Sequence, residues 1–229
     1  MLRLSKHERW ASDMRRFIPD IEALGESANR ALAAKNAARE AALSRCREAT
    51  RLSANAIRAV HRGEFDAAGE LTDRAGALLS EAKTALRDHL DILHAGFVHD
   101  AAKEYAEARI TLALISGQGA SLPTPGALDV ELAAYLNGLG EAVGELRRYL
   151  LDRLRSGDVD RCEECLAVMD EAYGILVTFD YPDAMTGGLR RTTDNVRGIL
   201  ERTRGDLTLA VRQRDLERTL AEFESRLKG

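Results

Sequence analysis

Aromatic residues and proline are scarce in this chain, and it has no long apolar run. Only 5% of its 229 residues are aromatic and only 4 are proline. Ala, Leu, Arg and Glu dominate instead, a composition that favours helices over strands. No apolar stretch approaches the ~20 residues that a membrane-spanning helix needs, and the first residues show no signal-peptide pattern. These absences predict an all-α, cytoplasmic protein without a membrane partner.

Cysteine is scarce as well, because 3 residues are too few for a disulfide framework. Two of them, Cys162 and Cys165, form a Cys-x-x-Cys pair. A zinc site needs four ligands, and no second Cys or His pair lies nearby in the sequence. A thioredoxin-like motif would follow a strand, which the helical pattern does not provide. We therefore interpret the pair as two small residues of a helix.

Charge of one sign is not in excess, since the formal net charge is -4. No global basic field therefore drives binding to nucleic acid. A chain of this length suits one large domain, and no segment is long enough to be a linker between domains. We expect a single helical domain over residues 1–229, with residues 1–20 as a peripheral N-terminal helix.

Gly and Pro divide the chain into helical segments. The expected helices span about residues 6–17, 21–61, 64–88, 91–115, 129–154, 159–178 and 189–225. The helix at 129–154 carries an apolar stripe with offsets of three and four residues, which is typical of one helix face. The stripe consists of Leu132, Leu136, Leu139, Val143, Leu146 and Leu150. The expected fold class is an all-α, single-domain bundle of about six or seven helices.

Two acidic residues share an edge of the expected helix 91–115. Glu104 and Glu107 lie three residues apart, about 60° from each other on a helical wheel, and they flank the apolar face. Carboxylates on one edge can hold Mg²⁺, which prefers oxygen ligands. A solvated acidic edge is the alternative, because acids at this spacing are common on helices.

A second acidic pair, Glu141 and Glu145, lies opposite the leucine stripe of the next helix. Three glycines surround this pair: Gly138, Gly140 and Gly144. Each glycine inside a helix costs up to ~1 kcal/mol relative to alanine. We therefore expect that another backbone, or a ligand, approaches the helix here.

Arginines form a stripe on the expected helix 21–61. They are Arg47, Arg51, Arg58 and Arg62. The four fall within about 60° of arc and face away from the apolar positions. Such a line suits a phosphate backbone. An ordinary solvated face is the alternative, because Glu40 and Glu48 lie near the stripe.

Residues 97–108 read FVHDAAKEYAEA. This segment resembles the Glu-Tyr-x-Glu-Ala helix of the translin/TRAX family of helical nucleic-acid-binding proteins. Residues 135–146 (YLNGLGEAVGEL) are similar to a second motif, which in TRAX reads Tyr-Leu-x-Gly and then Asp-x-x-Gly-Glu-Leu. Residues 156–158 fall at the family's Gly-Asp break, and residues 47–63 resemble its early helix. The resemblance extends from about residue 40 to residue 210.

The resemblance implies a translin-like fold, an octamer-like homo-oligomeric ring, and a site. TRAX-type members are Mg²⁺-dependent endoribonucleases whose active site is built from these two acidic pairs. The resemblance thus implies that the catalytic and metal-binding residues are Glu104, Glu107, Glu141 and Glu145, with Mg²⁺ or Mn²⁺ as the cofactor. Glu141 departs from the family pattern, since TRAX has the shorter Asp there.

Three hypotheses follow. The first is a Mg²⁺-dependent endoribonuclease that acts on single-stranded or partly unpaired RNA inside the ring, with the arginine stripe holding the RNA backbone. The second is a non-catalytic translin-like ring that binds single-stranded RNA or DNA. The third is a helical scaffold with protein partners only, whose RNA affinity would show no salt dependence.

Overall fold

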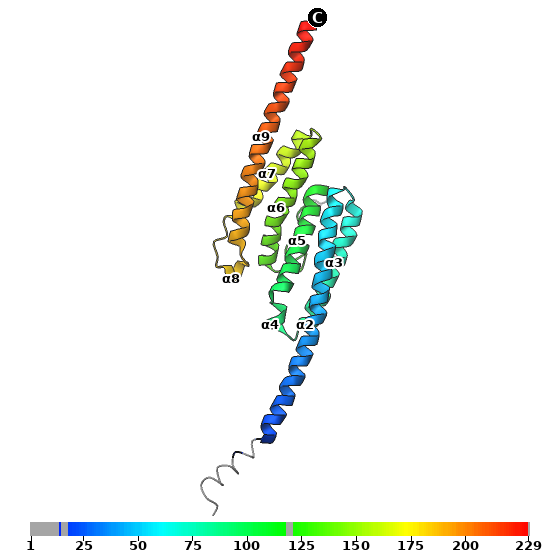
Figure 1. Ribbon diagram of the computed structural model, residues 1–229, viewed down its shortest axis with the longest axis vertical. Coiled ribbons are helices and arrows are strands. Elements are labelled where there is room, and N and C mark those ends of the chain that lie inside the picture. The colour runs from blue at the N-terminus through cyan, green and yellow to red at the C-terminus, as the bar shows by residue number, and fades with distance from the viewer. Residues whose placement is uncertain (1–13, 15–17, 118–120, 229) are drawn as a thin grey trace, which may run out of the picture.

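The computed structural model describes residue 14 and residues 18–117 and 121–228, and its regular secondary structure there is entirely helical (Figure 1). The helices are α2 (Ile18–His61), α3 (Phe65–Leu86), α4 (Leu90–Leu93), α5 (Gly96–Ser116), α6 (Leu132–Arg155), α7 (Val159–Leu176), α8 (Asp183–Thr186) and α9 (Leu189–Lys228). The predicted all-α fold class is confirmed. The helix expected at residues 6–17 lies outside the described residues, apart from Met14.

The helix expected at residues 91–115 is divided in two, which corrects the prediction. The short α4 ends at Leu93, and α5 begins at Gly96 after Ala95, whose backbone is extended (φ -73, ψ 150). Leu93 packs against the core from the short helix. Glycine at position 96 weakens the helix locally, so packing of the preceding turn can redirect the chain here.

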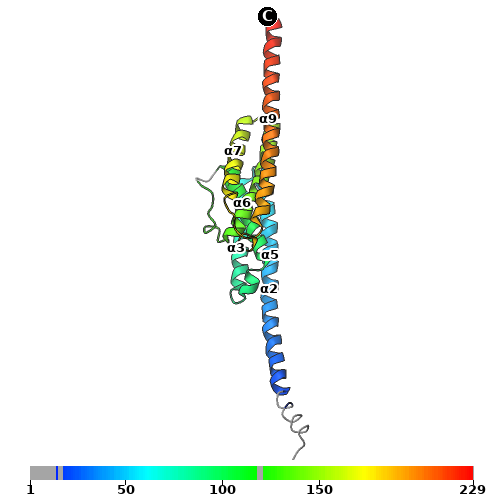
Figure 2. The same cartoon turned by 90° about the vertical axis from the view of Figure 1, so that its left-hand side faces the viewer.

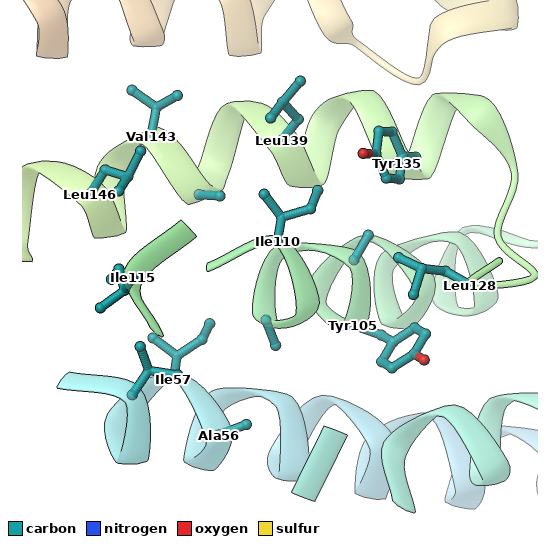
Figure 3. Close-up of a cluster of buried hydrophobic side chains, with 14 of the residues drawn as sticks. Ala56, Ile57, Tyr105, Ile110, Ile115, Leu128, Tyr135, Leu139, Val143 and Leu146 are labelled. Atoms are coloured by element: carbon teal, nitrogen blue, oxygen red, sulfur yellow. The ribbon is translucent and has the colours of Figure 1, made fainter. Parts of the chain in front are cut away.

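The two central helices are α5 and α6 (Figure 1). On one side α2 and α3 pack against each other and against α5, and on the other side α7 and α9 pack against each other and against α6. Their buried residues form one contiguous hydrophobic cluster. Figure 3 shows part of it, with Ile57 of α2, Ile110 of α5 and Leu139 of α6. The predicted leucine stripe of α6 is buried except for Leu132 at the first turn.

Two helices extend beyond the bundle at its opposite ends (Figures 1 and 2). Residues 20–34 of α2, here called the α2 arm, are all exposed, and so are residues 212–227 of α9, here called the α9 arm. Both arms carry exposed apolar side chains, which are Ile21, Leu24 and Leu32 on the α2 arm and Leu216, Leu220, Phe223 and Leu227 on the α9 arm. Among the described residues, no helix has the length and apolar content needed to cross a membrane.

Candidate metal centre

Gly138 allows the backbones of α5 and α6 to come into contact. A β carbon placed on Gly138 would lie 2.8 Å from the Lys103 carbonyl oxygen and 2.9 Å from the Glu107 amide nitrogen. These are backbone atoms inside a helix, which cannot move aside as a flexible side chain can. The expected close approach of another backbone is confirmed here, and it brings the helices of the two acidic pairs together.

The other two glycines of this segment differ from Gly138. A β carbon on Gly140 would clash with the Thr192 side chain of α9, so this glycine allows α9 to pack closely. A β carbon on Gly144 would meet only Ile199, at 3.9 Å, which is ordinary contact. Packing therefore explains Gly138 and Gly140 but not Gly144.

Glu104 and Glu107 of α5 converge with Glu141 of α6, and we call these three residues the three-carboxylate cluster. One carboxylate oxygen from each lies within 4.8 Å of the others. Glu107 is only 8% exposed. Burial, reinforced by the charges of the neighbouring carboxylates, raises the pKa of Glu107 to about 8. Three oxygen donors so close together fit a divalent cation such as Mg²⁺, whose charge would offset their repulsion.

Two charged residues, Lys103 and Asp100, lie near the three-carboxylate cluster on the same helix as Glu104 and Glu107. Lys103 donates a hydrogen bond from Nζ to Glu141 Oε1 at 2.6 Å. Burial, followed by the charge of Glu141, raises the pKa of Glu104. Asp100, which shares this sector of the helical wheel, is exposed and does not join the cluster. The cluster thus consists of three acids, one of which is already paired with a lysine.

Glu145 lies beside the three-carboxylate cluster and pairs with His61. The distance between His61 Nε2 and Glu145 Oε2 is 2.5 Å. This hydrogen bond holds the pKa of Glu145 below its usual range. The charge of Glu145 in turn contributes to the raised pKa of Glu107. Of the four acids that the sequence predicts for one site, the structure brings three together and places the fourth next to them.

His61 and Lys103 are site residues that the sequence patterns did not single out. His61 is the last residue of α2 and is separated from Glu145 by 84 positions, so no local spacing connects them. The one signal in the sequence is that His61 directly follows Ala59 and Val60, which are apolar and buried. A histidine at that point lies at the edge of the core.

The four arginines of the predicted stripe are exposed, three on α2 and the fourth, Arg62, in the turn directly after it. They are Arg47, Arg51, Arg58 and Arg62. Arg51 and Arg62 are already paired, with Glu48 at 2.6 Å and with Glu64 at 2.5 Å. Among the described residues, the recorded hydrogen bond of the Arg58 side chain goes to the neutral amide of Asn55, at 2.6 Å, and Arg47 has no recorded ion pair. Their contact with nucleic acid stays a prediction.

The Cys-x-x-Cys pair lies in the core. Cys162 and Cys165 are both buried on α7, and burial raises the pKa of Cys165 to about 11. The Cys162 thiol donates to the Leu150 carbonyl oxygen at 3.4 Å. Thiols in such surroundings are inert, which agrees with their interpretation as packing residues.

Comparison with known proteins identifies relatives of this helical bundle. No model of a protein family matches the chain. Over 196 residues it is 30% identical to MJ0175, an uncharacterized protein of Methanocaldococcus jannaschii, which covers 84% of this chain and 85% of that protein. Among solved structures it is similar to AfC3PO, crystallised alone and in complex with duplex RNA, at 35% identity and a TM-score of 0.74.

That match covers 82% of this chain and 97% of the AfC3PO chain. The structure of apo-NeC3PO is similar in fold alone, at 19% identity and a TM-score of 0.71, over 84% of this chain and 98% of that one. The fold and the site together define an all-α bundle with a carboxylate cluster between its two central helices. The chain belongs to the translin family, as the C3PO proteins do.

Proposed function

We propose that this protein is a Mg²⁺-dependent endoribonuclease. The observation that carries the proposal is the convergence of Glu104, Glu107 and Glu141 around a buried carboxyl group. Three carboxylates in one place are unfavourable without a cation, so the donor set fits a divalent metal. The complex of the 35% identical AfC3PO with duplex RNA supports RNA as the ligand.

The residues of the proposed active site have different roles. The three-carboxylate cluster holds the metal, which is Mg²⁺ or Mn²⁺. When bound, such an ion supplies charge stabilisation at the scissile phosphate and lowers the pKa of a bound water. Glu141, longer than the Asp of TRAX, is held by Lys103. Glu145 stays ionised beside the cluster because His61 donates to it.

The arginine stripe on α2 binds the phosphates of an RNA strand that is single-stranded or partly unpaired. Contacts to phosphates carry little sequence information, so the preference among sequences is weak, and single-stranded DNA is a second ligand. Arg47 and Arg58 contribute most, because Arg51 and Arg62 are already compensated by neighbouring acids. Replacing Arg47 or Arg58 by Gln therefore lowers the salt dependence of RNA affinity by about one unit of slope each.

A homo-oligomeric ring, octamer-like, is the proposed assembly. Leu216, Leu220, Phe223 and Leu227 are each more than half exposed. Their offsets of four, three and four residues place them within about 60° on one face of the α9 arm. Monomeric proteins rarely expose a contiguous apolar stripe of this kind, so a second copy of the chain covers it. Closed symmetry is the usual arrangement of identical subunits.

A translin-like ring that binds RNA or single-stranded DNA without catalysis is the second candidate. The observation that favours it is the ion pair between Lys103 and Glu141, since a lysine partly neutralises the cluster without a metal. In that case the acids are structural.

Incubation of the purified protein with end-labelled RNA in Mg²⁺ and in EDTA distinguishes the candidates. Single-stranded, partly unpaired and duplex RNA are compared. The nuclease yields fragments in Mg²⁺ that disappear in EDTA and with Glu107→Gln, while RNA binding in EDTA persists. Asp100→Asn is the matched control, an exposed acid on the same helix, and it continues to cleave. Intact but bound RNA under every condition identifies the non-catalytic ring. The absence of any salt-dependent RNA affinity identifies a protein scaffold.

A further inference from the structure

His61 is the one hydrogen-bond partner recorded for Glu145 within the described residues, and it comes from a different helix. We propose that His61 is a positioning residue that orients Glu145 as the fourth carboxylate of the metal site. This inference rests on the proposed metal-dependent function. It concerns how the chain holds one oxygen of Glu145 at the edge of the three-carboxylate cluster.

The geometry of the pair defines the role of each ring nitrogen. The His61 side chain is 5% exposed, and its Nε2 lies 2.5 Å from Glu145 Oε2. An ionised carboxylate only accepts hydrogen bonds, so Nε2 carries the proton. Nδ1 is buried and has no hydrogen-bond partner among the described residues. Within the part of the chain that the structure describes, Glu145 is therefore the one recorded polar partner of this imidazole.

The two oxygens of Glu145 are not equivalent. His61 contacts Oε2. Arg148, which lies on α6 as Glu145 does, approaches the same oxygen at 3.8 Å. No hydrogen bond to Oε1 is recorded within residues 18–117 and 121–228. With Oε2 fixed, Oε1 is the atom left for a cation. Carboxylate ligands are commonly held in this way by a second group, and loss of that group typically weakens metal affinity or activity 10–100-fold.

The His61–Glu145 pair lies among other acids. The charge of Glu145 is one of those that raise the pKa of Glu107, so it disfavours the ionised form of Glu107. The pair between His94 and Glu131 shows the ordinary alternative, with side chains that are 61% and 64% exposed and lie on the surface. A bound cation would compensate the negative charge of Glu145 beside the three-carboxylate cluster, which explains the position of the His61–Glu145 pair.

Binding of Mn²⁺ alone to the full chain, without RNA, tests the role of His61. Electron paramagnetic resonance of free Mn²⁺ gives the dissociation constant. His61→Phe weakens binding by roughly tenfold, the range seen when such a supporting group is lost. His61→Gln stays within about threefold of wild type, because its amide nitrogen takes the place of Nε2. His61→Asn weakens binding as His61→Phe does, because its amide is too short. His94→Phe is the matched control and leaves Mn²⁺ affinity unchanged.

A double-mutant cycle shows whether His61 acts through Glu145. In the Glu145→Gln background, His61→Phe changes Mn²⁺ affinity by less than about twofold, because the carboxylate that it orients is gone. Unchanged affinity in His61→Phe, or a full additional loss in the double variant, overturns the inference. If His61→Phe does not fold, the comparison of His61→Gln with His61→Asn tests the inference. Equal Mn²⁺ affinities of these two variants overturn the inference. Wild-type protein that binds no Mn²⁺ contradicts the proposed metal site itself, and the inference with it.

Discussion

At the scale of single residues, Glu107 has the most perturbed environment of the acids in the site. It is 8% exposed, and burial together with the neighbouring carboxylates raises its pKa from 4.5 to about 8. In the metal-free protein at pH 7 its carboxyl group is therefore mostly protonated. Groups with strongly shifted pKa values in contact with other acids are typical of functional sites.

The raised pKa of Glu107 predicts how stability depends on pH. Between pH 4.5 and about 8 the folded state binds more protons than the unfolded state, so the metal-free protein loses stability as pH rises through this window. Glu107→Gln cannot ionise and removes this contribution. We expect its melting temperature at pH 8.5 to exceed that of wild type by about 2–4 °C, equivalent to about 1 kcal/mol.

Differential scanning calorimetry at pH 5.5 and pH 8.5 in EDTA measures this difference. At pH 5.5 the advantage of Glu107→Gln is much smaller, because only the first part of the window between pH 4.5 and about 8 has been crossed. Asp100→Asn, at an exposed acid one turn before Glu104, keeps the pH dependence of wild type. An equal pH dependence in Glu107→Gln and wild type would contradict the assignment.

At the scale of helices, most of the pattern is local and was predictable. The apolar spacing predicted α6 and its buried face, and the glycine and proline positions predicted the ends of α2 and α7 to within a few residues. The break between α4 and α5 was not predicted, because packing of Leu93 against the core redirects a chain whose spacing is continuously helical. Propensity is a weak guide where tertiary contacts compete with it.

Contact between α5 and α6 predicts opposite effects of two similar substitutions. Gly138→Ala forces a methyl group into the backbone of α5, so we expect the free energy of unfolding to fall by about 1–3 kcal/mol, together with weaker Mn²⁺ binding. Gly144→Ala makes only an ordinary contact with Ile199 and raises the helix propensity of α6. It should therefore stabilise the protein by up to about 1 kcal/mol. Urea denaturation followed by circular dichroism measures both, and a stabilising Gly138→Ala would contradict the close packing.

At the scale of the whole molecule, the arms are the feature that the bundle does not explain. They extend from opposite ends of the bundle and carry apolar side chains that are more than half exposed (Figures 1 and 2). Because helices that leave the bundle have no core to bury their apolar face, their stability depends on a partner surface.

The α9 arm therefore predicts a variant that fails to assemble. Leu220→Asp places a charge in the centre of the apolar stripe, and its burial against a second copy is strongly unfavourable. We expect the oligomer to dissociate at concentrations at least about tenfold higher than for wild type, which corresponds to ~1.4 kcal/mol. Ser225→Asp, on the opposite face of the same arm, is the control. Multi-angle light scattering after size-exclusion chromatography gives the masses, and equal masses for both variants would exclude this stripe as the interface.

The sequence by itself determined which segments are helices, which faces of them are apolar, and which residues carry the acidic and basic stripes. These properties repeat with the period of the helix, so they can be found from local spacing. The resemblance of two motifs to the translin family added the grouping of four glutamates.

Only the tertiary structure decided how those glutamates meet. Gly138 allows α5 and α6 to touch, which brings Glu104 and Glu107 to Glu141. Glu145 lies next to these three residues and pairs with His61, which is 84 positions away on α2. The meeting of side chains from different helices depends on packing across the whole bundle, and helical periodicity contains no information about it.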